Sequence, residues 1–375
     1  MRKILMRTSM NPLDTIDSAQ VIAQNMIGNN AGNMLFAYSV MRTLLCENVH
    51  IDTTPTYKEF TEREVDYINQ TYECFVIPLA NAFRASFKQE LIYLTNLIRR
   101  LQIPCVVIGV GTQLKVDEKI NRTFSFDEES RSFVKAVLEK SSMIGVRGEI
   151  TAEYMKHLGF SEETDFTVIG CPSMYMHGDQ LCLKEPEELT PASLVSVNRK
   201  IGIPAKLHEF IVRSSEQFEN YMYVPQGIED FTLLYAGRTI NRKKYPNIHD
   251  SYPWNIEHPI YKNGHEIGFT NVQSWLAFLR ERDFSFGTRI HGNIAAVLAG
   301  IPVYIFAPDA RILELARYHN IQHMAAKDIT DNTNIFELYE KADFYHVMDG
   351  HVERFHHYLD FLEMNGLSHV FGEQR

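Results

Sequence analysis

The sequence lacks any Cys-x-x-Cys pair and any apolar run that approaches the length of a membrane span. Its N-terminal apolar run is also too short for a signal peptide. Both absences predict a cytoplasmic protein. In that reducing compartment we expect buried free thiols for its five cysteines, which are Cys46, Cys74, Cys105, Cys171 and Cys182.

The sequence also has no excess of positive charge. Lysine and arginine number 37 against 47 aspartates and glutamates, so the formal net charge is -10 at pH 7. This balance argues against a general affinity for nucleic acid and allows at most peripheral contact with a membrane. The histidines His346, His351, His356 and His357 lack the spacing of metal ligands. We therefore expect no nucleic acid partner, no metal and no cofactor.

What the sequence does contain is an alternation of short apolar runs with amphipathic segments, which is typical of parallel α/β architecture. In the first half we predict strands at 19–24, 74–80, 103–111, 143–148 and 166–170, and helices at 32–45, 87–101 and 130–141. In the second half we predict strands at 193–198, 220–226, 284–287 and 301–306, and helices at 205–218, 229–237, 272–283, 289–300 and 310–319.

The alternation predicts two Rossmann-like parallel-sheet domains that face each other across a cleft. The 375 residues, of which 45% are hydrophobic, suffice for two such cores. A polar, acidic stretch with two prolines at 178–191 is typical of a linker between them. We therefore expect an N-terminal domain at 1–180, a C-terminal domain at 190–345 and a helical segment at 346–375.

A candidate anion site occurs in the stretch FGTRIHGNIAAVLAGIPVYIFAPD at 286–309, which predicts a strand, a tight turn, a helix and a strand. Thr288 is a suitable N-cap for a helix that begins at Arg289. Arg289 and His291 would then lie in the first turn, where cations oppose the helix dipole unless an anion binds there. The alternative is an arginine in solvent and a histidine bonded to a neighbouring carbonyl.

This stretch resembles the signature of the polysaccharide pyruvyl transferase family, with Ser/Thr, Arg-aliphatic-His, small residues and Gly-aliphatic-Pro before a strand. Three more segments are similar to family segments: GNNAGNML at 28–35, IGVRGEITAEYMKHLG at 144–159 and VIGCPSMYM at 168–176. The chain departs from the family at Asn33 and Cys171, where the family commonly has aspartates. No carboxylate is available at either position.

The resemblance implies a GT-B-like fold and transfer of a pyruvyl group from phosphoenolpyruvate to two sugar hydroxyls, which forms a cyclic ketal during polysaccharide biosynthesis. It places the donor on the C-terminal domain, and we expect donor contacts from Arg199, Thr288, Arg289, His291 and Gly292. The acceptor, a saccharide that can be lipid-linked, is expected on the N-terminal domain. Its expected contacts are Asn30, Gly32, Asn33, Arg147 and Trp254.

The roles of some of these residues have alternatives. Arg199, which follows a predicted strand, could instead be a surface charge beside Lys200. His291 is our candidate general acid–base catalyst, although it could serve only to bind phosphate. Its carboxylate partner would be Glu229, Asp230 or Asp309, each of which could instead cap a helix.

The stretch 237–268, which is long, irregular and rich in aromatic and basic residues, predicts contacts with sugar rings, with Trp254 as one of them. A solvated insertion is the alternative. The turn with Gly109 and Gly111 indicates tight backbone geometry or a pocket wall. For the whole protein, the alternatives are a GT-B glycosyltransferase that uses a nucleotide sugar and a non-catalytic saccharide-binding protein.

Overall fold

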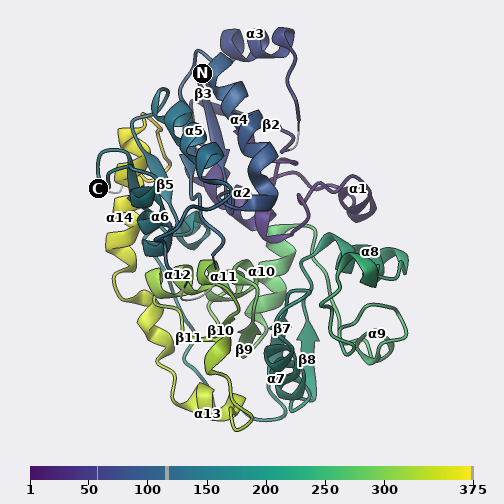
Figure 1. Ribbon diagram of the computed structural model, residues 1–375. Helices are drawn as coiled ribbons and strands as arrows, with labels where there is room; N and C mark the ends of the chain where they lie inside the picture. Colours follow the sequence, from purple (N-terminus) through teal and green to yellow (C-terminus); the bar gives the residue numbers. More distant parts are fainter. Residues whose placement is uncertain (57, 115–117, 373–375) are drawn as a thin grey trace. The chain divides into compact units, whose positions relative to one another are not determined.

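The computed structural model describes residues 1–56, 58–114 and 118–372, which form two compact units (Figure 1). Unit 1 comprises Met1–Leu13, Phe36–Asp179 and Gly350–Arg375, and unit 2 comprises Asp14–Leu35 and Gln180–Asp349. These units differ from the expected ranges at two segments. Residues 14–35 join the second unit, and the C-terminal segment joins the first.

Unit 1 contains a four-stranded parallel sheet in the order β2-β1-β3-β4 and a parallel pair β5-β6. Its strands are β1 (Arg2–Arg7), β2 (Val49–Thr54), β3 (Cys74–Pro78), β4 (Cys105–Ile108), β5 (Ile144–Val146) and β6 (Phe166–Val168). Its helices are α2 (Gly32–Leu44, which begins in residues of unit 2), α3 (Glu62–Thr71), α4 (Lys88–Arg100), α5 (Asp127–Leu138), α6 (Glu149–His157) and α14 (His351–Met364), with the 3-10 helices η1 (Ala85–Phe87) and η2 (Pro172–Tyr175).

Unit 2 contains a five-stranded parallel sheet in the order β11-β10-β9-β7-β8. Its strands are β7 (Leu194–Asn198), β8 (Asn220–Tyr223), β9 (Phe284–Gly287), β10 (Val303–Ala307) and β11 (His323–Ala325). Its helices are α1 (Ser18–Ala23), α7 (Ala205–Ser215), α8 (Ile228–Ala236), α9 (Pro259–Lys262), α10 (Val272–Arg280), α11 (Ile290–Leu298), α12 (Ala310–Tyr318) and α13 (Ile335–Glu340), with the 3-10 helices η3 (Arg242–Lys244), η4 (Ala326–Asp328) and η5 (Phe344–Met348).

The two parallel sheets confirm the predicted α/β fold class. Every residue of β3 and β4 is buried, as expected for strands that helices cover on both faces of a parallel sheet. The strand predicted at 19–24 is wrong, because this segment forms α1. The carboxylate of Asp17 accepts hydrogen bonds from the N–H groups of Ala19 and Gln20 and caps that helix.

The stretches expected to be irregular pack within unit 2. Residues 180–190 contain no helix or strand, yet the N–H of Lys184 donates to the carbonyl of Gly300 over 2.7 Å. Within 237–268, Ile240, Ile248 and Tyr252 share a small hydrophobic cluster with residues of the surrounding unit. Among the residues that the structure describes, no helix is both long and apolar enough to span a membrane.

The carboxyl ends of β7 and β9 approach each other closely at Gly287. Its φ is 151°, and a Cβ at this position would lie 1.8 Å from the carbonyl oxygen of Asn198. Only glycine fits without displacing the backbone of β7. This approach places the residues that follow the two strands side by side.

Gly287→Ala should therefore destabilise unit 2. Steric overlap with the β7 backbone and a disfavoured φ should together cost roughly 2–4 kcal/mol and lower the melting temperature by roughly 5–15 °C. Thermal unfolding of the purified variant measures this. Gly372→Ala is the control, since its Cβ would lie an ordinary 3.6 Å from the carbonyl oxygen of His369. Equal melting temperatures for the two variants would contradict the steric argument.

Candidate functional site

The candidate site lies in unit 2 where β7 and β9 end. Ligands of parallel α/β folds bind at this edge of the sheet. Arg199 follows β7, whereas Thr288, Arg289 and His291 follow β9 and lead into α11. The structure therefore brings together the residues that the sequence predicted to bind the donor.

The start of α11 is fixed by buried amides. Arg289 is its N-cap residue, so the prediction of Thr288 as N-cap is wrong by one position. The Arg289 N–H donates to Oδ1 of Asn198 over 2.7 Å, and Nδ2 of Asn198 donates to Oδ1 of Asn293 over 3.0 Å. Thr288 is buried, and its hydroxyl oxygen accepts from the N–H of Lys200 over 3.0 Å. An asparagine from the neighbouring strand thus takes the capping role.

Arg199 is buried, with only 3% of its surface exposed, which excludes the alternative of a surface charge. Its guanidinium carbon lies 5.0 Å from the ring centroid of Tyr223 and 5.3 Å from that of Tyr252. Nε and Nη2 of Arg199 have no hydrogen-bond partner within the described part of the chain. Buried N–H groups without an acceptor are costly, so these two nitrogens are suited to an anionic ligand.

The turn at 28–35 packs against His291. His291 is 6% exposed, and a Cβ on Gly32 would lie 2.5 Å from its Nδ1. Oδ1 of Asn30 accepts from the N–H of Gly32 over 2.9 Å, and Nδ2 of Asn33 donates to the carbonyl of Gly28 over 2.9 Å. These two asparagines hold the turn in shape, and the glycine leaves room for the imidazole.

Gln226 is a site residue that the sequence did not reveal. It is 1% exposed, and its Nε2 has no partner among the residues described. A Cβ on Gly292 would lie 2.3 Å from that Nε2, so the glycine allows the amide to approach the first turn of α11. Gln226 adds a second buried donor without an acceptor near the helix start.

Of the three predicted carboxylate partners, only Asp230 lies at the site. It is fully buried and accepts from the hydroxyl of Tyr252 over 2.7 Å. Burial raises the pKa of Asp230, and the charge of Arg289 opposes this rise. Glu229 pairs instead with Lys244 and Tyr245, and Asp309 caps α12.

Glu266 is a second carboxyl group that the sequence did not reveal. The hydroxyl of Tyr261 donates to its Oε1 over 3.0 Å, while its buried Oε2 has no partner in the described chain. Burial raises the pKa of Glu266 to about 8, and the hydrogen bond from Tyr261 and the charge of Arg199 act against this rise. Glu266 is therefore mostly protonated at pH 7.

Two further residues predicted to bind the acceptor, Arg147 and Trp254, have contacts of their own. Arg147 is buried in unit 1, where its Nε donates to the carbonyl of Gly109 over 2.8 Å. Gly109 has a φ of 74°, which fits the tight-turn interpretation. Trp254 is half-buried in the cluster of residues 237–268, and the Arg242 guanidinium carbon lies 5.3 Å from its ring centroid.

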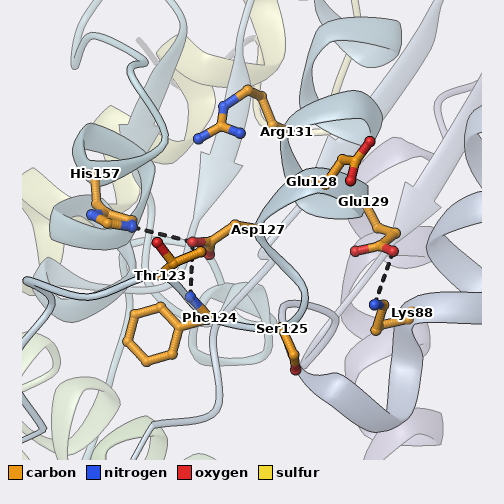
Figure 2. Close-up of a pocket in the computed structure, with 9 residues that line it drawn as sticks. All are labelled: Lys88, Thr123, Phe124, Ser125, Asp127, Glu128, Glu129, Arg131 and His157. Carbon is orange, nitrogen blue, oxygen red and sulfur yellow. Dashed lines mark hydrogen bonds and ion pairs between the residues drawn. The ribbon is translucent and has the colours of Figure 1, made fainter.

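Unit 1 has a polar pocket of about 420 Å³, shown in Figure 2. It lies beside the first turns of α4 and α5, the helices that follow strands β3 and β4. Nε2 of His157 lies 3.3 Å from Oδ2 of Asp127, and Lys88 pairs with Glu129 at 3.0 Å. Its remaining lining residues are Thr123, Phe124, Ser125, Glu128 and Arg131. Three carboxylates and two permanently charged basic side chains line this pocket, together with hydroxyl groups and His157.

The chain matches a family and a fold. The sequence model described as "Polysaccharide pyruvyl transferase" matches residues 30–310. No curated protein matches the chain in sequence. The described residues contain no group of three or more His, Cys, Asp or Glu side chains that could hold a metal ion.

The solved structures that resemble the chain in fold include two UDP-GlcNAc 2-epimerases. UDP-GlcNAc 2-epimerase from Methanocaldococcus jannaschii, in complex with UDP-GlcNAc and UDP, has a TM-score of 0.50 at 11% identity and covers 96% of this chain and 99% of its own. UDP-GlcNAc 2-epimerase from Neisseria meningitidis, bound to UDP-GlcNAc, has a TM-score of 0.50 at 8% identity, with coverages of 97% and 100%. Identities this low show the fold alone, which is GT-B-like, as predicted.

Glu266→Gln should change how stability depends on pH. Because the folded-state pKa of about 8 exceeds the ordinary value of 4.5, ionisation of Glu266 opposes folding progressively as the pH rises from about 5 through 8. The variant lacks this penalty, so its stability relative to wild type should increase over that range. Chemical unfolding at pH 5 and pH 8 measures it.

Glu257→Gln is the matched control, because Glu257 is exposed and pairs with Lys262 in the same stretch. It should shift stability little at either pH. A Glu266→Gln variant with the same stability difference from wild type at pH 5 and pH 8 would contradict the raised pKa.

Proposed function

Because the chain belongs to the polysaccharide pyruvyl transferase family, we propose that it transfers a pyruvyl group from phosphoenolpyruvate to two hydroxyls of a saccharide. The observation that carries the proposal is the buried Arg199, which lies at the same sheet edge as Arg289 and His291. Its Nε and Nη2 have no acceptor within the described chain. Phosphoenolpyruvate carries a phosphate and a carboxylate on one small frame. Arginine binds either group through two parallel hydrogen bonds.

The reaction requires a group that donates a proton to phosphoenolpyruvate and a group that accepts a proton from a sugar hydroxyl. Protonation of the methylene carbon makes an oxocarbenium-like centre at the adjacent carbon, which the first sugar hydroxyl attacks. The proton released by the first hydroxyl replaces the one given to the methylene carbon. Loss of phosphate recreates the oxocarbenium-like centre, the second hydroxyl closes the cyclic ketal, and the proton of that hydroxyl leaves with the phosphate. We assign the proton transfers to His291, since imidazole titrates near neutral pH and can both give and take a proton.

The acceptor assignment belongs to the same proposal. Asn30 and Asn33 already use their side chains within the turn beside His291, so we propose that they shape the donor site. Arg147 and Trp254 remain our proposed acceptor contacts. The polar pocket of unit 1 offers further groups for sugar hydroxyls (Figure 2). Free and lipid-linked saccharides both fall within this proposal.

Arg289→Ala should weaken binding of phosphoenolpyruvate. Loss of a charged donor from a shielded site should cost roughly 2–4 kcal/mol, which is a dissociation constant about 30 to 1,000 times higher. Isothermal titration of the wild type and the variant measures this. Arg213→Ala, which removes an exposed arginine from α7, is the control. Unchanged affinity in Arg289→Ala, or binding of UDP in place of phosphoenolpyruvate, would overturn the donor assignment.

His291→Gln should separate proton transfer from binding. Glutamine keeps a hydrogen-bond donor but cannot shuttle a proton, so the turnover number should fall by about 10²–10⁴-fold while donor affinity changes little. Steady-state kinetics across pH should also show that the limb set by this histidine is lost. Near-normal turnover with the wild-type pH profile would leave His291 as a binding residue only.

A further inference from the structure

The direction of the Arg199 guanidinium is set by two buried tyrosines. Tyr223 ends β8, and Tyr252 comes from the irregular stretch 237–268. Both are 1% exposed, and their ring centroids lie 5.0 and 5.3 Å from the guanidinium carbon. A guanidinium held against two aromatic faces keeps its plane, so its nitrogens point in one direction before any ligand binds.

The hydroxyls of the two tyrosines form a directional hydrogen-bond chain that ends at Asp230. The Tyr252 hydroxyl donates to Oδ1 of Asp230 over 2.7 Å and lies 2.9 Å from the Tyr223 hydroxyl. The Tyr252 proton is directed at the carboxylate, so the Tyr223 hydroxyl donates to Tyr252 in this pair. The other acceptor for the Tyr223 proton, the carbonyl of Arg199, is farther away at 3.5 Å. The N–H of Gly227 donates to Oδ2 of Asp230 over 3.3 Å and anchors the end of the chain.

Asp230 also faces the second arginine of the site. A Cβ built on Gly227 would lie 2.7 Å from Oδ2 of Asp230 and 3.3 Å from Nη2 of Arg289. The carboxylate and that guanidinium therefore flank the same glycine. One buried negative charge is thus close to Arg289 and is connected through two hydroxyls to the rings that hold Arg199.

We propose that Asp230, Tyr252 and Tyr223 are positioning residues that align Arg199 with the anionic group of the donor. This inference rests on the proposed function. Connected buried hydrogen bonds give a site its rigidity, and a rigid second layer fixes the groups that touch the ligand. It also gives part of the 237–268 stretch a role in donor binding, because that stretch supplies Tyr252.

Tyr252→Phe tests the chain directly, because it keeps the ring over Arg199 and removes only the hydroxyl. The KM for phosphoenolpyruvate and its dissociation constant should rise about tenfold. A merely structural role would reduce the folded fraction and hence kcat per total protein, and would leave KM unchanged. Tyr245→Phe is the matched control from the same stretch. The Tyr245 hydroxyl donates to Glu229 and takes no part in the hydrogen-bond chain.

Substitutions of Asp230 provide a second, independent measurement. Asp230→Leu removes the acceptor of the chain and should raise KM as Tyr252→Phe does. Asp230→Asn keeps an oxygen for Tyr252 and removes a charge that repels the donor, so its KM should not rise. The KM of the double variant Tyr252→Phe/Asp230→Leu should lie within about threefold of the KM of either single variant, because both substitutions break the same hydrogen-bond chain.

Inorganic phosphate serves as a probe that does not depend on the proposed function. If the wild type binds phosphate and not phosphoenolpyruvate, the donor assignment fails. In that case, weaker phosphate binding by Tyr252→Phe would still support the role of the hydrogen-bond chain in aligning Arg199. Wild-type affinity for both anions in Tyr252→Phe and in Tyr223→Phe would overturn the inference. The inference would also be overturned if the KM increases of the two single variants multiplied in the double variant. A wild type that binds neither phosphate nor phosphoenolpyruvate would overturn it as well.

Discussion

The burial of one positive charge without a matching acceptor is the constraint on which the site depends. Arg199 is 3% exposed, and two of its nitrogens have no partner in the described residues. Two tyrosine rings lessen the cost of its burial, and a carboxylate behind them holds those rings in place. An anion bound to these nitrogens, as proposed, would remove the remaining cost of burial.

Close backbone approach is the second requirement, and glycines provide it. A side chain at Gly32 would displace His291, one at Gly292 would displace Gln226, and one at Gly287 would overlap β7. The polar groups therefore converge from the ends of two strands and from an N-terminal turn that belongs to the same unit. Ligands of parallel α/β folds bind at this edge of the sheet, where the strands end.

Sequence patterns predicted the parts of this arrangement that local chemistry determines. Continuous apolar runs identified β3 and β4, and two cations near a predicted helix start led to the prediction that Arg289 and His291 belong to one candidate site. The roles of Tyr252 and Gln226 could not be found in this way, because they arise from contacts between segments far apart in the chain. The N-cap was misplaced for the same reason, since the side chain that caps α11 comes from Asn198 on another strand.

The most direct test of the account is the transfer reaction itself. Wild-type protein is incubated with phosphoenolpyruvate and a panel of bacterial surface glycans, while phosphate release and the proton NMR spectrum of the glycan are followed. The account predicts phosphate release that requires a glycan, with one new methyl singlet of a pyruvate ketal for each phosphate released. If the protein instead consumed UDP-sugars added with the same glycans and left phosphoenolpyruvate intact, the account would be contradicted.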